Sequence, residues 1–251
     1  MKSTTCLFLP LLLGLSSCVM AGSTIEWHPD TLVLVGPGGN YGRMIRLPDG
    51  VLLCAYGGDA ALWTTRSADD GRTWSSPEVA ATFPHGIAAN AELLALDNGW
   101  ILLLVNERPD TGLHPYAICT YRSTDGGRHW VPHARIFEAG TTSVEGCWEP
   151  AAVQLPTSEI MLFFANEAPY GASNEQEISL VRSQDRGQSW TAPETFSFRP
   201  GNRDGMPVPL LLNNGDGLVV AIEDSERPHR KLQPTILYLD LATGWRGEPI
   251  G

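Results

Sequence analysis

The sequence predicts an all-β fold built from a repeated module, and three observations support this prediction. A nine-residue phrase occurs three times at regular spacing. A β-hairpin signal lies upstream of each copy of the phrase. Beyond the first 21 residues, no segment of any length shows the 3.6-residue hydrophobic period of a helix. Together these features favour modules made of short strands.

The repeated phrase reads Arg-Ser-x-Asp-x-Gly-x-x-Trp. Its copies are RSADDGRTW at 66–74, RSTDGGRHW at 122–130 and RSQDRGQSW at 182–190, so its serines lie 56 and 60 residues apart. An Asp side chain can accept hydrogen bonds from turn backbone, Gly can adopt a positive φ, and Trp can pack under the next module. We therefore interpret the phrase as a structural turn that occurs once in each module.

The hairpin signals begin at Leu47, Leu96, Leu155 and Leu212. Three of the four place Asp-Gly or Asn-Gly between apolar runs, which is the strongest short-range signal for a hairpin. Each module is then predicted to run strand, tight turn, strand, loop, strand, turn, strand, with the phrase in the second turn. Four-stranded modules of this period, arrayed around an axis, form a β-propeller. About four such modules, or blades, begin in this chain.

Residues 1–21 are predicted to be a signal peptide, and residues 22–251 the folded domain. Lys2 precedes the apolar stretch CLFLPLLLGL, which is too short to span a bilayer, and VMA at 19–21 offers small residues for cleavage. The segment LSSC at 15–18 supports a second hypothesis, a bacterial lipobox in which Cys18 carries a lipid anchor. Either hypothesis predicts a protein that is secreted, periplasmic or attached to the cell surface.

Charge and cysteine content exclude several classes of function. The chain has 17 basic and 28 acidic residues, so nucleic acid and anionic surfaces are poor partners for it. Cys54, Cys119 and Cys147 remain in the domain, and their spacing fits no zinc site. At most one disulfide can form among three thiols, and buried free thiols are the simpler expectation. No cofactor and no metal are implied.

Strand order predicts which residues share an edge of the propeller. In an up-and-down blade, the first strand starts at the edge where the second strand ends, and the repeated phrase lies at the opposite edge. Residues before first strands and after second strands should therefore converge on one mouth of the central channel. This rule selects Arg43, Glu92, Glu149, Arg203 and Asp204 before the first strands, and Asp59, Glu107, Glu167 and Glu223 after the second strands.

A ring of carboxylates with two arginines suits a polar ligand that is rich in hydroxyl groups. Trp148 lies beside this ring in the sequence, and its indole can stack on a sugar face. Glycoside cleavage needs one protonated carboxyl to donate to the leaving oxygen and one ionised carboxylate to attack or to activate water. Crowded acids separate these roles, because crowding raises some pKa values and leaves others low. The pattern indicates a reaction class but no particular sugar.

The repeated phrase resembles the Asp-box of the sialidase superfamily, whose members are six-bladed propellers. The three copies, at blade spacing, extend this resemblance over roughly residues 40 to 250. The resemblance implies a sialidase-like β-propeller in which the boxes are structural and lie away from the catalytic face. It also implies six blades in the complete fold, so the domain is expected to be incomplete at its C-terminus.

Other segments resemble the exo-arabinanase family of the sialidase clan. In order, they are Trp148-Glu149-Pro150, FFANEAPYG, NRDGMPVP and the glutamate that follows an apolar strand at Glu223. The resemblance implies removal of short arabinose units from arabinan chain ends with retention of configuration. It places the two catalytic carboxylates on Glu149 and Glu223. We assign Glu149 as acid/base and Glu223 as nucleophile, and the reverse order of roles stays open. The remaining selected residues and Trp148 are expected to bind substrate, which makes an oligosaccharide or polysaccharide the expected partner.

Two alternatives remain open. An exo-α-sialidase is the first, because YGRMIRL resembles the start of sialidases, where an Arg such as Arg43 holds the substrate carboxylate, and Asp59 is placed like their acid/base aspartate. The segment lacks the Pro of that motif. A non-catalytic carbohydrate-binding propeller is the second, because this fold hosts many functions. The number of acids in the ring favours an enzyme over a lectin.

Overall fold

The computed structural model describes residues 28–212, 215–225 and 232–243. The chain divides into the units Met1–Leu32 and Val33–Gly251. Within the first unit, the 3-10 helix η1 (Pro29–Thr31) is described. The predicted signal peptide and Cys18 lie outside the described residues. Among the residues that are described, no helix is both long enough and apolar enough to cross a membrane.

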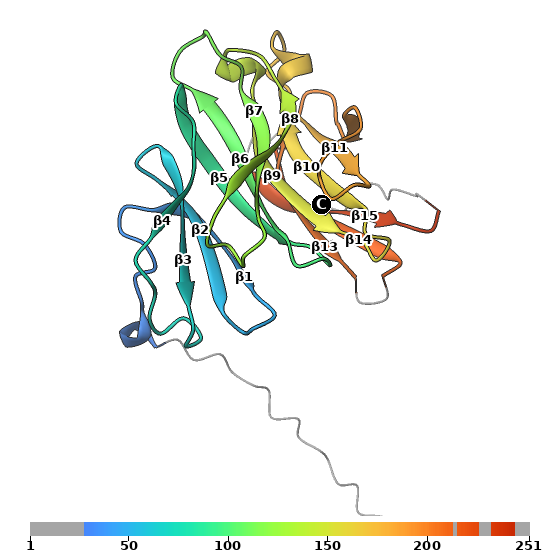
Figure 1. The fold of residues 1–251 in the computed structure, drawn as a ribbon. Coiled ribbons are helices and arrows are strands. Elements are labelled where there is room, and N and C mark those ends of the chain that lie inside the picture. Colours follow the sequence, from blue (N-terminus) through green and yellow to red (C-terminus); the bar gives the residue numbers. More distant parts are fainter. Residues whose placement is uncertain (1–27, 213–214, 226–231, 244–251) are drawn as a thin grey trace, which may run out of the picture. The chain divides into compact units, whose positions relative to one another are not determined.

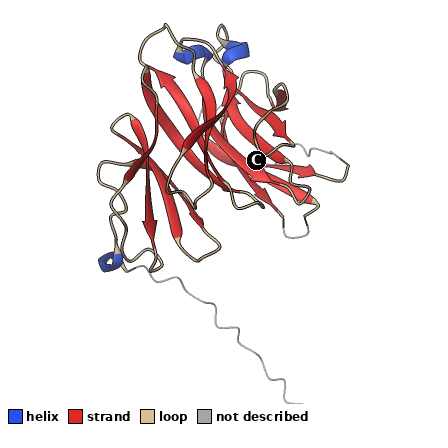
Figure 2. Ribbon diagram, in the orientation of Figure 1, coloured by secondary structure: helices blue, strands red, loops and turns tan. Residues whose placement is uncertain are grey.

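In its described part, the unit Val33–Gly251 consists of four antiparallel sheets joined by loops (Figures 1 and 2). Blade 1 contains β1 (Asn40–Arg46), β2 (Leu52–Gly58), β3 (Ala61–Ser67) and β4 (Glu78–Thr82). Blade 2 contains β5 (Gly86–Ala95), β6 (Ile101–Pro109), β7 (Ala117–Ser123) and β8 (Val131–Glu138). Blade 3 contains β9 (Cys147–Gln154), β10 (Ile160–Asn166), β11 (Glu177–Ser183) and β12 (Glu194–Ser197), with η2 (Ser143–Glu145) and η3 (Ala168–Tyr170). Blade 4 contains β13 (Asp204–Leu211), β14 (Gly217–Asp224) and β15 (Gln233–Asp240).

The four sheets are arranged as propeller blades. Each sheet keeps its strands in sequence order, and the first strands β1, β5, β9 and β13 contact one another in succession. The first strand of each blade is therefore the innermost one. This arrangement confirms the predicted β-propeller, and the described residues form four blades, three of four strands and one of three.

The hydrophobic core lies between successive blades. Strand β6 packs against a neighbouring blade on each of its faces. Leu103 belongs to the core shared with blade 1, and Leu102 and Leu104 belong to the core shared with blade 3. Successive side chains of a strand point to opposite faces, so a strand packed on both faces is apolar throughout. Full burial of one such leucine contributes about 1.5–3 kcal/mol.

The repeated phrase forms the same hydrogen-bonded turn in three blades. In blade 3, the hydroxyl of Ser183 donates a hydrogen bond to the Asp185 carboxylate at 2.9 Å and accepts one from the Gly187 N–H at 2.8 Å. The same carboxylate accepts the Ser189 N–H at 2.8 Å. Gly187 has a φ of 82°, which only glycine adopts at little cost. Blades 1 and 2 repeat these bonds, so the phrase is structural, as predicted.

The tryptophan of the phrase packs on the preceding blade, whereas the sequence suggested the next one. Trp130 of blade 2 contacts the core between blades 1 and 2, and Trp190 of blade 3 contacts the core between blades 2 and 3. The turn glycine also lies close to the preceding blade: a Cβ on Gly127 of blade 2 would lie 2.6 Å from Leu53 of blade 1. The turn thus fixes each blade to the one before it.

Among the described residues, the three cysteines are free and buried. Burial raises the pKa of the Cys119 thiol to about 12, so this thiol is held in its neutral form. The expectation of buried free thiols is confirmed.

Each innermost strand carries a bulge at corresponding positions. Pairing with the second strand is interrupted in β1, β5, β9 and β13. One non-glycine residue in each bulge has a φ between 46° and 55°: Tyr41, Asn90, Glu149 and Met206. A bulge re-aims side chains at the end of a strand. The four bulges lie near the starts of the innermost strands, at the edge opposite the repeated turns.

Candidate active site

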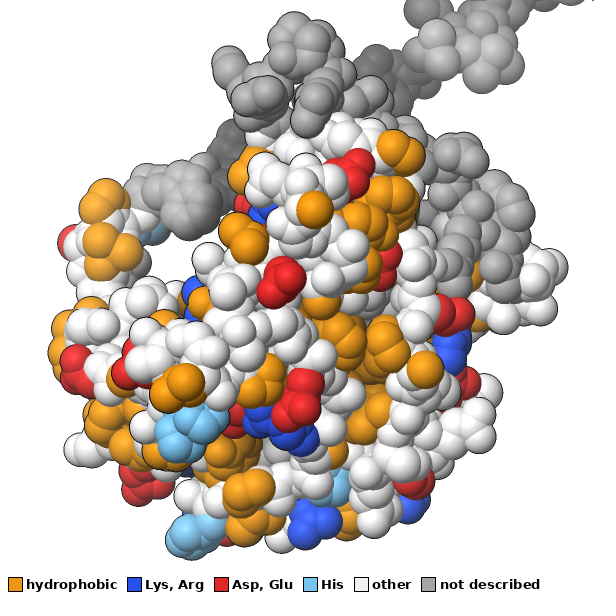
Figure 3. Space-filling view, turned by 90° about the horizontal axis from the view of Figure 1, so that it is seen from above, with side chains coloured by type: hydrophobic (Ala, Val, Ile, Leu, Met, Phe, Trp, Pro, Cys, Tyr) orange, Lys and Arg blue, Asp and Glu red, His pale blue; other side chains and the backbone are white. Residues whose placement is uncertain are grey.

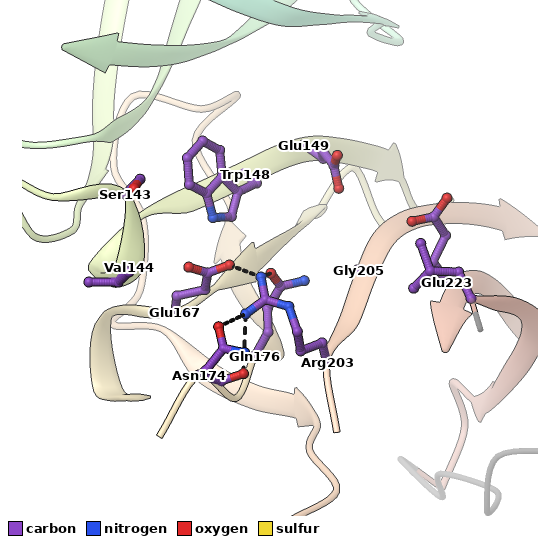
Figure 4. Close-up of a pocket in the computed structure, with 11 residues that line it drawn as sticks. Ser143, Val144, Trp148, Glu149, Glu167, Asn174, Gln176, Arg203, Gly205 and Glu223 are labelled. Carbon is purple, nitrogen blue, oxygen red and sulfur yellow. Dashed lines mark hydrogen bonds and ion pairs between the residues drawn. The ribbon is translucent and has the colours of Figure 1, made fainter. Parts of the chain in front are cut away.

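The candidate site is a cleft at this edge, where blades 3 and 4 meet. Its volume is about 450 Å³. Its wall includes Trp148 and Glu149 of β9, Glu167 after β10, Gln176 before β11, Arg203 and Gly205 at the start of β13, and Glu223 of β14 (Figure 4). Figure 3 shows the face of the molecule that carries this edge, on which acidic and basic side chains lie beside one another. Four residues that the edge rule selected from blades 3 and 4 therefore line one cleft: Glu149, Glu167, Arg203 and Glu223.

Glu149 lies in the bulge of β9, with a φ of 55°. Its Oε2 accepts the backbone N–H of Met206, in the bulge of β13, at 3.0 Å. Burial raises the pKa of this carboxyl, and the charge of Glu223 raises it further. The Met206 hydrogen bond and the charges of Arg108 and Arg43 oppose the rise without cancelling it. Glu149 is therefore a carboxyl that retains its proton to higher pH than an ordinary glutamate.

Glu223 lies on β14 opposite Gly205 of the adjacent strand. Figure 4 shows its carboxylate on the same side of the cleft as that of Glu149. Gly205 allows Gln176 to approach closely: a Cβ at this position would lie 2.9 Å from Gln176 Nε2 and 3.9 Å from Glu149 Oε2. The site thus presents two carboxyl groups from neighbouring blades to one cleft.

Arg203 forms a polar wall together with its partners. Its guanidinium makes an ion pair with Glu167 and donates to Gln176 Oε1 at 2.9 Å and to Asn174 Oδ1 at 3.0 Å (Figure 4). The backbone N–H of Arg203 donates to Ser225 Oγ at 2.8 Å. Arg203 and Glu167 are consequently fixed in one arrangement, with their charges mutually compensated.

Trp148 supplies the aromatic wall of the cleft. Its ring meets Tyr116 edge-on, with the centroids 4.9 Å apart. The guanidinium of Arg108 lies over the same indole, 4.9 Å from its centroid. The ring is therefore held from two sides while it borders the cleft, which is a suitable arrangement for stacking against a ligand.

Blades 1 and 2 contribute a second polar group at the same edge. Arg43 Nε donates to Glu92 Oε2 at 3.1 Å, and its guanidinium lies 4.1 Å from the Tyr41 ring centroid. Burial raises the pKa of Glu92. The charge of Arg43 also acts on Glu149. Arg43 and Glu92 do not line the cleft, but the charge of Arg43 affects a carboxyl that does.

Besides Arg43 and Glu92, three further residues selected from the sequence do not line the cleft. Glu107 points to the outer strand β8, where it makes an ion pair with Arg135 at 2.5 Å. Asp204 is fully buried and makes an ion pair with Arg199 of the loop between β12 and β13. Asp59 is exposed in the turn between β2 and β3, with a φ of 49°. The expectation that Glu107 and Asp204 contact a ligand is therefore corrected.

Strand register explains the corrections. Counted from the bulge, Glu107 occupies the same register position as Asn166 and Asp224, while Glu223 corresponds to Asn106 and Ala165. Neighbouring positions along a strand face opposite sides, so an offset of one residue turns a side chain away from the site. Ionisable residues that looked equivalent in the sequence are thus not equivalent in the fold.

Sequence reasoning missed five polar residues at this edge: Tyr41, Asn90, Arg108, Asn174 and Gln176. Three of them are amides, which a search restricted to ionisable groups passes over. Arg108 is adjacent to the selected Glu107, and register alone distinguishes the two. Tyr41 and Asn90 occupy bulge positions, which share no residue type, so no local sequence pattern identifies them.

Comparisons with known proteins agree with this fold. Residues 112–214 match the BNR repeat-like domain. The alpha-L-arabinanase of Penicillium chrysogenum, complexed with arabinobiose, is 21% identical with a TM-score of 0.70, and the match covers 85% of this chain. The alpha-L-arabinofuranosidase of Fusarium graminearum, also with arabinobiose, is 19% identical with a TM-score of 0.69 over 82% of this chain. A Hadza microbial sialidase is 14% identical with a TM-score of 0.57 over 80% of this chain.

The chain spans about two thirds of the first two structures, 67% and 63% of their lengths, and 44% of the sialidase. No curated protein sequence matches the chain. At these identities the likeness concerns the fold. The described part of the chain is therefore a sialidase-like β-propeller, similar in architecture to arabinanases, arabinofuranosidases and sialidases.

Proposed function

We propose that the protein is an exo-acting glycoside hydrolase that uses Glu149 and Glu223 and cleaves neutral arabinan-type oligosaccharides. The observation that carries this proposal is the pair of carboxyl groups in one cleft, of which Glu149 has a raised pKa. Glycoside cleavage needs this difference, because one carboxyl must hold a proton while the other is ionised. The Trp148 ring and the amide-rich wall around Arg203 suit a hydroxyl-rich ligand.

The proposed reaction retains the configuration of the sugar. Glu149 donates its proton to the leaving glycosidic oxygen while the Glu223 carboxylate attacks the anomeric carbon, forming a glycosyl ester. Glu149, now ionised, takes a proton from water, and this water releases the sugar from Glu223. The Met206 N–H keeps one oxygen of Glu149 in place throughout.

Charge pairing favours a neutral substrate over a sialoside. A sialic acid carboxylate needs an arginine whose charge is available to it. Arg43 and Arg203, the two arginines that the sequence offered for this role, are both bound to carboxylates, Glu92 and Glu167. Arg108, whose hydrogen bonds go to amides, is stacked on Trp148 and does not line the cleft. Two structures of similar fold hold arabinobiose, which makes arabinan the first substrate to test.

We also propose export of the protein. Its basis is the sequence of residues 1–21, with cleavage after Ala21 or lipid attachment at Cys18 as the two routes. An extracellular or periplasmic location would give the enzyme access to polysaccharide. Labelling of the expressed full-length chain with radioactive palmitate distinguishes the two routes, because only the lipoprotein incorporates it.

The direct test is hydrolysis of linear 1,5-linked arabinan and of sialyl-lactose by wild type, Glu149→Gln and Glu223→Gln. We expect arabinose-containing products from chain ends, with kcat reduced at least about 10³-fold in both variants. Glu78→Gln, on the exposed surface of β4, is the matched control and should keep wild-type activity. Release of sialic acid that survives Glu223→Gln would instead support a sialidase. Binding without hydrolysis by folded wild type would support a carbohydrate-binding propeller.

A further inference from the structure

Arg108 is held by three contacts at the border between blades 2 and 3. Its guanidinium lies over the indole of Trp148, 4.9 Å from the ring centroid. Its Nε donates to Asn106 Oδ1 at 2.8 Å, and its terminal nitrogen donates to Asn90 Oδ1 in the bulge of β5. A planar guanidinium that is stacked on one face and bonded along its edge has little freedom to move.

The same contacts fix the start of β9. Asn106, which accepts from Arg108, donates through Nδ2 to the carbonyl oxygen of Cys147 at 2.9 Å. Cys147 and Trp148 are the two residues that precede Glu149. Arg108 therefore restrains the backbone that enters the strained bulge of Glu149, as well as the aromatic wall of the cleft.

The partners of Arg108 leave its charge uncompensated by a direct ion pair. In the described structure, its two hydrogen-bond acceptors are neutral amides, whereas Arg43 is bound to Glu92 and Arg203 to Glu167. Glu149 is the acid with the strongest electrostatic interaction with Arg108, and each charge shifts the pKa of the other group.

We propose that Arg108 is a positioning residue of the site, which holds Trp148 and the start of β9 in place and presents a positive charge to Glu149. This inference rests on the proposed function, which gives Glu149 its role as the acid/base. The groups that act on Glu149 are Glu223 of β14, Arg108 of β6, Arg43 and Tyr41 of β1, and the Met206 N–H of β13. Of the two arginines among them, Arg108 is the one whose charge no carboxylate pairs.

The test measures the titration of Glu149 directly, without substrate. Protein labelled with ¹³C at the glutamate carboxyl groups is titrated by NMR, and Glu149→Gln identifies the signal. We expect Arg108→Gln to raise the Glu149 midpoint by about one pH unit, because a favourable opposite charge is removed. Arg108→Lys, which keeps a charge but loses the stacked fork, should bring the midpoint part of the way back. If Arg108→Gln does not fold, Arg108→Met carries the same expectation, with an unbranched stem to pack on Trp148.

Arg122→Gln is the matched control. Arg122 stacks over Trp100 at 4.4 Å in blade 2, so the control variant loses an equivalent contact. Arg122 lies on β7 and is the first residue of the repeated phrase, at the edge opposite the cleft. This variant should leave the Glu149 midpoint unchanged. An unchanged midpoint in a folded neutral variant of Arg108 would overturn the proposal. Because the titration needs no turnover, an inactive wild type would count against the proposed function without deciding the role of Arg108.

Discussion

At the scale of the residue, Glu149 combines two unfavourable features. It is a non-glycine residue in the left-handed backbone region, which costs on the order of 1–3 kcal/mol. Its carboxyl is also partly buried beside another acid, which disfavours the charged form. Features of this kind gather at functional sites, where a constrained and easily protonated carboxyl is useful.

This burial predicts how stability depends on pH. The pKa of Glu149 is higher in the folded protein than in the unfolded chain, so the folded state holds the proton more tightly. The contribution of Glu149 to the free energy of unfolding should therefore be most favourable below the ordinary glutamate pKa of about 4.3 and fall as pH rises towards the raised value. Glu149→Gln removes this loss and should raise Tm at pH 7 by about 2–4 °C, which is about 1 kcal/mol for a domain of this size.

Thermal melts of wild type and Glu149→Gln at pH 4 and pH 7 check this prediction. The difference in Tm should be larger at pH 7 than at pH 4. Glu78→Gln, on an exposed strand surface, should change Tm little at either pH. A Glu149→Gln variant that is less stable than wild type at pH 7 would show that the ionised carboxylate contributes favourable contacts.

At the scale of the element, the repeated turn joins a blade to its predecessor. The turn serines are almost fully buried, and each satisfies a backbone N–H that would otherwise have no partner inside the protein. Hydrogen bonds from Ser189 lower the pKa of Asp185 to about 2, so the turn keeps its carboxylate ionised at almost any working pH. The turn is therefore a stability device placed far from the cleft.

Ser183→Ala should destabilise the protein by about 1–3 kcal/mol. The change leaves the buried Gly187 N–H without its acceptor and removes a partner of Asp185. Urea unfolding followed by tryptophan fluorescence measures the loss. Ser76→Ala, at an exposed position, is the control and should remain within about 0.5 kcal/mol of wild type. A wild-type midpoint for Ser183→Ala would show that the turn does not secure its blade.

At the scale of the whole molecule, repetition made the fold predictable, and register made the site less so. Asp-Gly and Asn-Gly turns between apolar runs located the first hairpin of most blades, and the repeated phrase located the second turn. The converging edge then followed from antiparallel order alone. Glu149, Glu223, Glu167 and Arg203 were found in this way, and the structure brings them to one cleft.

The remaining part of the site depends on how two strands pair. The bulge residues Tyr41, Asn90 and Met206 share no side-chain chemistry, so no local pattern marks them. The sequence analysis selected Glu107 and passed over its neighbour Arg108, an error of one residue. Because successive side chains point to opposite faces of a strand, Glu107 lies on the face turned away from the site. Contacts between blades, such as Arg108 on Trp148, join residues 40 positions apart and have no counterpart in local sequence.

The central claim is that blades 3 and 4 each supply one catalytic carboxyl, with Glu223 as the nucleophile. The most direct measurement is mass spectrometry of Glu149→Gln after incubation with an aryl arabinobioside, whose good leaving group makes the proton donor unnecessary for the first step. We predict a glycosyl adduct on the peptide that contains Glu223, released by added azide, and no adduct in the Glu149→Gln/Glu223→Gln double variant. An adduct on another residue, or turnover by the double variant, would contradict the assignment.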